Sequence, residues 1–497
     1  MELPIPPYQI SKLKTNISYG QIQSFSFEEL SDWTDDLREE LLSMWVDENQ
    51  PPVIGVSKDL IIDRFKKLKD YDVNSFFIED ELYEDYLGFI KNFSKLASGV
   101  NQFFPALLKT RVMRGSETPL SIYDFLSNEK LFLHFKHEIV QKTRFDKMYL
   151  FTDYLKYDGD DIEDFIERWV SGLDTNTDFY LEPSNTTHKR ENNGKVVLDM
   201  EMIKSLQKRE IFNSDILRNK DGYDIKNEME EYYIRYYDKR TTIFTHLFQI
   251  LRLGLNQVAV NFPPLTARYL YEKYLPSEKS EVFKVYDNCA GWGGRLLGSL
   301  CSNLPIHYIG TDTNLNNKGC YERLGEFYNE HTDGKNTFEI HYVGAETIHK
   351  DENFKEHFGD VDMVFTSPPY FNREIYSDDE EQSCNKYKIY DDWRDYFLKP
   401  LIQNSYDILK NERYCLININ DIRRGEKDFI PLEQDTIQLA YDIGFEYIGK
   451  IGMCMSRMIG QNPTTQKNFY LEMKTQTTYK VEPIFVFHKP LDWPWNK

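Results

Sequence analysis

The chain has 497 residues and a formal net charge of −21, with 34 tyrosines and 33 phenylalanines. This length accommodates two or three domains, and the high aromatic content argues against a disordered chain. No apolar run approaches the ~20 residues of a membrane span, and the N-terminus lacks the basic and apolar regions of a signal peptide, so we expect a cytoplasmic protein.

Residues 1–250 are predicted to form a mainly helical N-terminal domain. Apolar residues recur there at the three- and four-residue spacing of amphipathic helices. The stretches with this spacing are Phe27–Trp45, Leu60–Tyr71, Tyr83–Leu96 and Ile122–Val140. Asp160–Leu173 begins with an acidic turn, as helix N-termini favour, and the polar stretch Asn185–Gly194 predicts a surface loop.

Residues 251–497 predict an α/β domain, because short β-rich runs alternate with helical stretches from about residue 280, as in mostly parallel sheets. The predicted strands are Val282–Tyr286, Ile306–Gly310, Phe338–Val343, Val361–Phe365, Tyr414–Ile419, Tyr447–Met453 and Ile484–His488. The predicted helices are Gly293–Cys301, Leu315–Tyr328, Asp351–Phe358, Asp391–Leu409 and Leu432–Tyr441. The last two strands have no long helix between them, so we expect an antiparallel pair at the sheet's edge.

A glycine-rich turn follows the first predicted strand and has the sequence Asp287-Asn288-Cys289-Ala290-Gly291-Trp292-Gly293-Gly294-Arg295. Its glycines permit a tight turn and close approach of the backbone to a ligand. Asp312 ends the second strand, 25 positions after Asp287, where an acidic residue is placed to hold ribose hydroxyls. The alternative is that Asp312 only caps the helix that begins near Asn314.

The next two strands end at the same predicted edge of the sheet. Glu346 follows the third strand, either as part of a ligand site or as the acidic start of a helix over Thr347–Lys350. The fourth strand leads into Thr366-Ser367-Pro368-Pro369-Tyr370. Its prolines cannot continue a ladder and fix a stiff turn. A hydroxyl, carbonyls and an aromatic ring so presented suit a planar group that bears an exocyclic amine.

This series of motifs resembles the S-adenosylmethionine-dependent amino methyltransferases, above all the DNA adenine-N6 and cytosine-N4 enzymes. The order in that class is a glycine-rich motif, an acidic motif and then [DNS]-P-P-[YFW], and the resemblance covers residues 260–490 but not 1–250. It implies a Rossmann-like, mostly parallel sheet of seven strands, with the site where the first and fourth strands part. The TSPPY form is commoner among cytosine-N4 enzymes.

The resemblance also implies roles for individual residues. Asp287, Gly291 and Gly293 would border the methionine part of the cofactor, with Ala290 in the same turn; Asp312 would bind the ribose, and Ala345 and Glu346 would flank the adenine. Ser367 and Pro368, followed by Pro369, would accept bonds from the target amine, and Tyr370 would stack on the target base. Trp292 departs from the small or varied residue usual between these glycines, and it either covers the cofactor or packs against preceding strands.

A segment before the glycine motif supports the cofactor in that class, and here Asn261-Phe262-Pro263-Pro264-Leu265-Thr266 has this place. The alternative is a proline-initiated helix over Pro264–Tyr274. Target recognition would fall to residues 1–250, to Phe371–Tyr390 after the SPPY motif, or to residues 454–481. Phe371–Tyr390 is either a substrate lid or an ordinary surface loop.

The implied activity is methyl transfer to a cytosine N4 or adenine N6 amine in DNA, with the base flipped into the site. The alternatives are an RNA base amine, or a non-catalytic nucleic-acid-binding or DNA-mimic protein. The net charge disfavours DNA, although basic residues in Lys136–Lys147 and Lys204–Lys220 could line a cleft. Six cysteines without a CxxC predict free thiols and no metal site, and no partner nuclease is indicated.

Overall fold

The computed structural model describes residue 15 and residues 27–47, 56–92, 96, 99–112, 120–132, 179–182, 189–190, 196–199, 259–276, 282–331, 335–424, 428–457 and 468–491. The predicted helix over Asp160–Leu173 and the basic stretches Lys136–Lys147 and Lys204–Lys220 lie outside these residues. None of the described helices is both long and apolar enough to cross a membrane.

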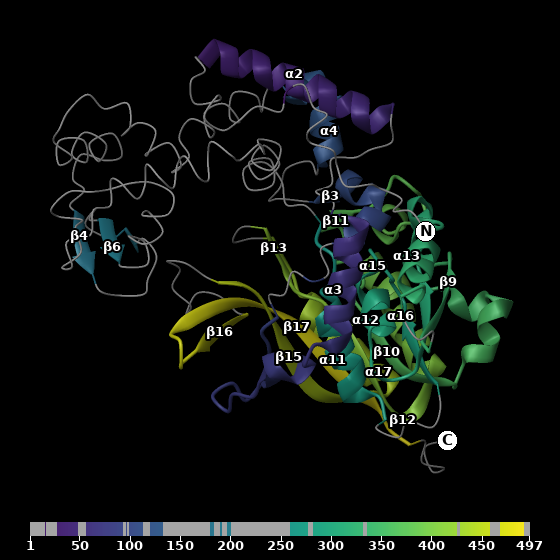
Figure 1. Cartoon of the computed structure of the whole chain (residues 1–497). Coiled ribbons are helices and arrows are strands. Elements are labelled where there is room, and N and C mark those ends of the chain that lie inside the picture. The colour runs from purple at the N-terminus through teal and green to yellow at the C-terminus, as the bar shows by residue number, and fades with distance from the viewer. Residues whose placement is uncertain are drawn as a thin grey trace.

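One large sheet organises the fold (Figure 1). Its strands are β1 (Phe77–Ile78), β2 (Tyr86–Ile90), β7 (Phe283–Asp287), β8 (Ile306–Thr311), β9 (Thr337–His341), β10 (Val361–Thr366), β12 (Leu409–Asn418), β15 (Glu446–Arg457), β16 (Phe469–Glu472) and β17 (Thr477–Lys489). Seven described strands lie outside this sheet and form small separate sheets. They are β3 (Arg111–Val112), β4 (Phe179–Glu182), β5 (Lys189–Arg190), β6 (Val196–Asp199), β11 (Glu374–Ile375), β13 (Ile422–Arg424) and β14 (Asp428–Ile430).

The strand order is β1-β2-β15-β17-β12-β10-β7-β8-β9, with β16 paired to β17. Strands β9, β8, β7, β10 and β12 are mutually parallel, whereas β17 runs antiparallel to both β12 and β15. This is the predicted Rossmann-like α/β sheet, and β7 and β10 lie side by side where the order reverses. Such a reversal leaves a crevice at the carboxyl ends of the strands.

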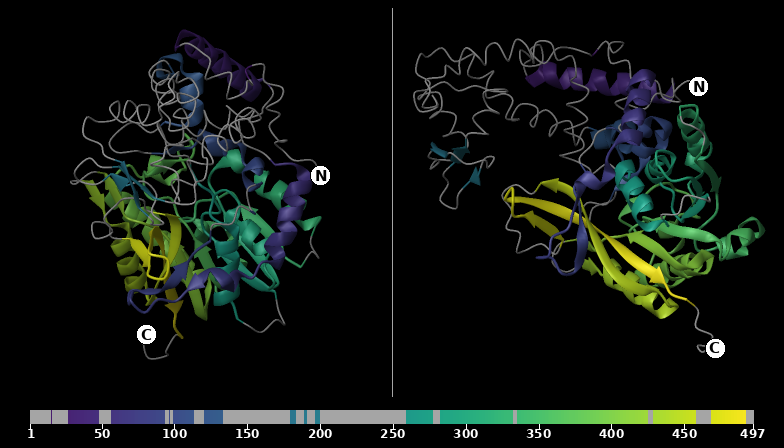
Figure 2. Two further views of the ribbon diagram at one scale, coloured as in Figure 1. Left: turned by 60° about the vertical axis from the view of Figure 1, so that its left-hand side comes forward. Right: turned by 60° about the horizontal axis from the view of Figure 1, so that its bottom comes forward.

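The helices cover both faces of the sheet (Figure 2). They are α2 (Phe27–Val46), α3 (Lys58–Asp70), α4 (Ile122–Ser127), α11 (Pro264–Tyr274), α12 (Gly294–Leu300), α13 (Cys320–Asn329), α14 (Ser383–Lys386), α15 (Tyr390–Trp393), α16 (Lys399–Ile408) and α17 (Leu432–Ile443), with the π-helix η9 (Arg394–Leu398). The 3₁₀ helices are η2 (Val73–Phe76), η3 (Val100–Phe103), η4 (Pro105–Lys109), η6 (Leu315–Asn317), η7 (Ile348–Lys350) and η8 (Glu352–His357). Helices α3 and α11–α13 share one buried core, and α16 and α17 share the other.

Two of the predicted features differ from the observed structure. The apolar spacing of Tyr83–Leu96 predicts a helix, but the segment contains β2, because this aromatic stretch pairs in parallel with β15 and buries Phe89 and Ile90. Tertiary pairing with an open strand edge outweighs the local pattern here. The predicted edge pair, β15 and β17, is antiparallel as expected, but β2 covers its outer strand, so the sheet has more than seven strands.

The described residues between 58 and 112 contribute to the hydrophobic core of the C-terminal sheet. Helix α3 begins at the Ser57 cap, and its apolar face buries Ile61, Phe65 and Leu68. The Phe65 ring lies 4.6 Å from the ring of Tyr328 on α13. The backbone of Leu68 accepts a 2.5 Å hydrogen bond from the buried guanidinium of Arg268 on α11. These contacts join the N-terminal segment to the C-terminal half of the chain.

Because of this shared core, replacing Phe65 should destabilise the whole α/β unit. We expect Phe65→Ala to lower the free energy of unfolding by about 3–5 kcal/mol, because a fully buried ring leaves a cavity. Leu60→Ala on the same helix is the control, since Leu60 is exposed and should change stability by only about 0.5 kcal/mol. Chemical denaturation would measure both, and an independent transition for residues 58–112 would contradict the shared core.

Candidate active site

A cleft of about 1100 Å³ opens at the carboxyl edge of the sheet, where β7 and β10 part. Predicted site residues that line it come from four different strand ends and from the segment before β7. They are Phe262, Gly291, Asp312, Ala345, Glu346, Ser367, Pro368, Pro369 and Tyr370. Asp287, Ala290 and Gly293 do not line the cleft.

The glycine turn after β7 has left-handed backbone at two positions, Gly291 (φ 63°) and Gly293 (φ 74°). A Cβ at Gly291 would meet no atom closer than 3.6 Å, whereas one at Gly293 would come within 2.7 Å of the Phe104 ring. Gly291 therefore leaves space beside the turn at the cleft. Gly293 allows the Phe104 ring to pack closely against the turn. Trp292 is buried near Phe104 and Tyr376 but also lines the cleft.

Asp287 is a structural group in this fold, and its side chain is fully buried. Its carboxylate accepts a 2.7 Å bond from Arg295 Nε and a 2.6 Å bond from the Tyr308 hydroxyl. Ala290 is likewise buried, and its N–H donates to the Thr311 carbonyl. Asp287 therefore positions the turn through α12 and β8 and does not itself line the cleft, whereas its predicted place at the border of the methionine part stays a prediction.

The segment before β7 forms the proline-initiated helix and also contacts the glycine turn. Helix α11 starts at Pro264, as predicted for a proline-initiated helix. Just before it, Asn261 accepts a 3.1 Å bond from Gly294 N–H and donates to the Trp292 carbonyl at 2.5 Å. Asn261 thus fixes the glycine turn from outside, and Phe262 lines the cleft beside it.

Asp312 lies in the cleft wall and also organises its own loop. Its carboxylate accepts bonds from Asn314 N–H at 2.9 Å, from Asn317 Nδ2 at 3.0 Å and from the Tyr321 hydroxyl. Burial raises the pKa of the Asp312 carboxyl, and these three donors oppose that rise. The helix-cap alternative is wrong, because η6 is capped by Asn314, and Asp312 instead bonds the N–H of that cap residue while lining the cleft.

Two further groups complete this side of the cleft. Glu346 is buried, and one of its oxygens lies 3.1 Å from Lys386 Nζ in the segment after the SPPY motif. The carbonyl of Ala345 accepts a 2.8 Å bond from Asn404. The side-chain nitrogen of Asn314 is buried without a hydrogen-bond partner among the described residues, and Asn314 also lines the cleft.

The SPPY turn follows β10, the neighbour of β7, and is fixed by Asn418 at the end of β12. Asn418 Nδ2 donates a 2.9 Å bond to the Pro483 carbonyl, which turns its Oδ1 toward the motif. Ser367 donates its hydroxyl proton to that oxygen at 3.2 Å. Because a serine oxygen has two acceptor lone pairs, this bond, in which the oxygen acts as donor, uses neither of them.

Tyr370 is half-buried, and its hydroxyl donates to Glu482. Burial raises the pKa of the Glu482 carboxyl and also that of Glu374, which accepts a bond from Tyr376. Sequence patterns do not single out Asn418, Glu374 or Glu482. The only signal for Asn418 is its position at the end of a predicted strand whose carboxyl end meets the same edge.

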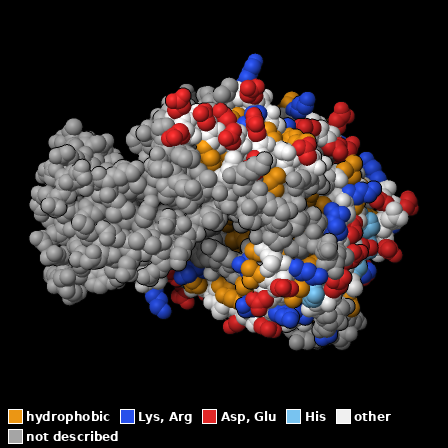
Figure 3. All heavy atoms as spheres, turned by 45° about the horizontal axis from the view of Figure 1, so that its top comes forward, with side chains coloured by type: hydrophobic (Ala, Val, Ile, Leu, Met, Phe, Trp, Pro, Cys, Tyr) orange, Lys and Arg blue, Asp and Glu red, His pale blue; other side chains and the backbone are white. Residues whose placement is uncertain are grey.

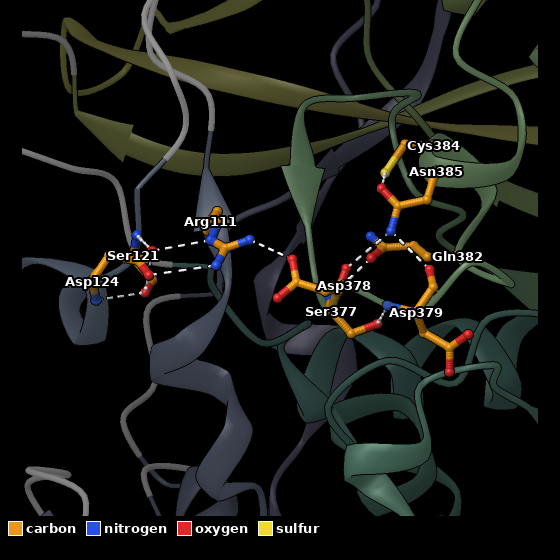
Figure 4. A network of polar contacts seen from close by, with 9 residues as sticks. All are labelled: Arg111, Ser121, Asp124, Ser377, Asp378, Asp379, Gln382, Cys384 and Asn385. Carbon is orange, nitrogen blue, oxygen red and sulfur yellow. Dashed lines mark hydrogen bonds and ion pairs between the residues drawn. The ribbon is translucent and has the colours of Figure 1, made fainter. Parts of the chain in front are cut away.

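Phe371–Tyr390 is folded around its own polar contacts and contains β11 and α14 (Figure 4). Asn385 donates to the backbone carbonyls of Ser377 and Asp379 at 3.2 and 2.8 Å. Strand β11 pairs with β3, and Arg111 on β3 bridges Asp124 and Asp378 at 3.0 and 2.5 Å. The N-terminal segment therefore holds the segment after the SPPY motif next to the cleft.

The described surface is acidic in places, and Figure 3 shows acidic side chains gathered on the upper part of one face. Helix α2 lies on that side in Figure 1 and includes Glu28, Glu29, Asp32, Asp35 and Asp36.

In the cleft, burial raises the pKa of the Cys289 thiol, so this cysteine is not set up as a thiolate nucleophile.

Comparisons with known proteins return only distant structural matches. No protein-family model matches the chain, and no curated protein matches it. Among solved structures, a Thermus thermophilus protein provisionally assigned as a DNA modification methylase, in complex with S-adenosyl-L-methionine, is 18% identical over 31% of this chain and 56% of that one, with a TM-score of 0.20. This chain thus spans about half the length of that protein.

Two other solved structures cover more of their own chains. A methyltransferase of Methanosarcina mazei, described as S-adenosylmethionine-dependent, is 14% identical over 45% of this chain and 98% of that one, with a TM-score of 0.26. A geranyl diphosphate methyltransferase is 10% identical over 46% and 85%, with a TM-score of 0.28. Identities and TM-scores this low leave the function to be inferred from this chain's own topology and residues.

Proposed function

We propose that this protein transfers a methyl group from S-adenosylmethionine to an exocyclic amine of a base in DNA. The observation that carries the proposal is that Ser367 and Tyr370 line the same cleft as Gly291, with the Ser367 hydroxyl proton directed at Asn418. A hydroxyl held in this way is an acceptor for an N–H group. An acceptor beside an aromatic ring suits a planar amine.

The residues around the glycine turn fit this cofactor. Gly291 leaves its side of the turn open, Asp312 offers a carboxylate to ribose hydroxyls, and the buried amide nitrogen of Asn314 has no partner among the described residues of the same wall. We assign Ala345 and Glu346, which line the same cleft, to the flanks of the adenine ring. When bound, S-adenosylmethionine supplies an electrophilic methyl group.

The protein's own contribution is to make the exocyclic amine, a poor nucleophile, more reactive and to orient it toward the methyl group. The lone pair of an aromatic amine is delocalised into its ring. If Ser367 and the Pro368 carbonyl accept the two N–H bonds, they favour a pyramidal nitrogen and stabilise the charge that develops there. The stiff Pro368-Pro369 turn and the stacked Tyr370 ring keep the amine in line for transfer.

We assign the acceptor to DNA, with cytosine N4 preferred over adenine N6 because of the TSPPY form. A base in a duplex must leave the stack to reach such a cleft, and Tyr370 offers it a stacking surface worth ~1–3 kcal/mol. The deciding experiment is mass spectrometry of nucleosides from DNA and RNA incubated with protein and cofactor. N4-methylcytosine or N6-methyladenine in DNA supports the proposal, whereas methylation of RNA alone, or of neither polymer, refutes it.

Asp312→Ala should weaken S-adenosylmethionine binding by roughly tenfold or more, because a charged hydrogen bond to a hydroxyl is worth ~1.5–3 kcal/mol. Isothermal titration calorimetry on folded protein would measure the loss. Asp351→Ala is the matched control: Asp351 accepts a similar bond from Asn353 N–H at 2.9 Å but does not line the cleft. Equal affinities for the Asp312→Ala protein and the wild type would exclude the ribose role.

Tyr370→Ala should lower methyl transfer by at least about 100-fold, since both stacking and alignment of the amine are lost. Cofactor affinity should stay near the wild-type value, because the ring is assigned to the base. Tyr370→Phe distinguishes the contribution of the ring from that of the hydroxyl. This variant should retain most of the turnover, although it loses the hydrogen bond to Glu482. Full turnover by Tyr370→Ala would mean that the SPPY motif is only a structural turn.

Ser367→Ala should reduce turnover with little change in substrate affinity, because one acceptor is lost while Pro368 remains. Asn418→Ala should reduce turnover as well, since the Ser367 hydroxyl would be free to rotate its proton toward the amine. The double variant should be no slower than Ser367→Ala, because Asn418 acts through Ser367. Single-turnover kinetics would measure all three, and additive losses would show that Asn418 acts independently.

A further inference from the structure

Three imidazole rings and a carboxylate converge on the face of the sheet between β8, β9 and η8. Glu339 and His341 lie on the same face of β9, two residues apart, and His357 lies at the end of η8. Glu339 Oε1 is 3.1 Å from His357 Nε2, and Glu339 Oε2 is 3.6 Å from His341 Nε2. One ligand atom from each of these three residues lies within 4.8 Å of the others.

These separations match those between ligands around a tetrahedral metal ion. Zinc binds imidazole nitrogen and carboxylate oxygen at about 2.0–2.1 Å, so two ligand atoms on one ion are about 3.3 Å apart. The distances from the Glu339 oxygens to His357 Nε2 and His341 Nε2, 3.1 and 3.6 Å, lie on either side of that value. Two imidazoles and one carboxylate are also a ligand set that zinc uses, with a fourth position left for water or another residue.

The hydrogen bonding of the histidines independently indicates a missing partner. Within the described part of the chain, His341 Nε2 and both ring nitrogens of His357 are buried without a hydrogen-bond partner, although buried polar atoms are normally paired. His357 Nε2 is close to Glu339 but is not aligned to donate to it. A metal ion among these atoms would provide a partner for His341 Nε2 and for one of the two His357 nitrogens.

His307 on β8 lies next to this group, and hydrogen-bond contacts of both its ring nitrogens fix its orientation. Its Nδ1 is 2.7 Å from the Thr337 hydroxyl, and its Nε2 is 3.2 Å from Glu339 Oε1. Metal-binding histidines usually engage their second nitrogen in this way, which fixes the orientation of the ring. His307 is thus a candidate for the fourth position or for support of Glu339.

We propose that Glu339, His341 and His357 form a binding site for a divalent transition metal, with zinc as the preferred ion. None of the three lines the cleft, so the site is separate from methyl transfer. The ion would tie η8 to β9, the edge strand of the sheet. Because the chain after β9 leads to Val343, Ala345 and Glu346 in the cleft wall, we assign the metal a structural role.

The test uses the full chain without a histidine tag, stripped of metal by a chelator. Zinc titrated against a chromophoric chelator should bind with one ion per chain and should raise the Tm. Cobalt(II) in its place should give the visible absorption of a tetrahedral or five-coordinate nitrogen and oxygen site. His341→Ala and Glu339→Gln should each weaken zinc binding by at least about tenfold, and His357→Ala provides a third test of the ligand set.

His488→Ala is the matched control, because His488 Nδ1 is also 3.1 Å from a glutamate oxygen, that of Glu446, but belongs to no three-ligand group among the described residues. This variant should keep wild-type zinc affinity. Circular dichroism would confirm that each variant is folded, and the partly exposed His341 is the least disruptive position. The proposal fails if folded wild-type protein binds no zinc, or if His341→Ala and Glu339→Gln bind it as well as His488→Ala does.

Discussion

The buried ion pair between Asp287 and Arg295 is the interaction on which the candidate site depends. It joins the end of the first parallel strand to the first turn of α12, and Tyr308 ties the same carboxylate to the second strand. Removing one partner of such a pair leaves a buried charge uncompensated, which costs about 3–5 kcal/mol. The glycine turn between them therefore has one conformation, and Gly291 is held open toward the cleft.

The part of the cleft wall formed by the SPPY turn is fixed by neutral hydrogen bonds. Asn418 is oriented by the Pro483 carbonyl and in turn orients the Ser367 hydroxyl. A serine hydroxyl alone rotates freely between donating and accepting. The amide from the neighbouring strand removes that freedom, as the proposed role of Ser367 as an acceptor for an amine proton requires.

The N-terminal segment contributes to both the core and the site. Strand β2 covers the outer edge of β15, which would otherwise expose unpaired backbone groups. Strand β3 pairs with β11, and Arg111 spans to Asp378, so the segment after the SPPY motif is held from outside the α/β domain. The division into a helical half and a catalytic half that the sequence suggested is therefore not a division of the core, since residues 58–112 pack within it.

The sequence by itself determined the order of the seven main strands and of the helices between them from residue 283 onward, because the alternation of β-rich and helical runs is local, but it did not predict β11, β13, β14 or β16. It also placed Gly291, Asp312, Glu346 and Ser367 at strand ends that meet at one edge, since parallel strands share their direction. Only the tertiary structure decided that Asp287 faces inward to Arg295, that Tyr83–Leu96 contains a strand, and that Asn418 serves Ser367. These outcomes depend on partners between 8 and more than 300 residues away, such as β15 for β2, and no local pattern of residues encodes contacts with such partners.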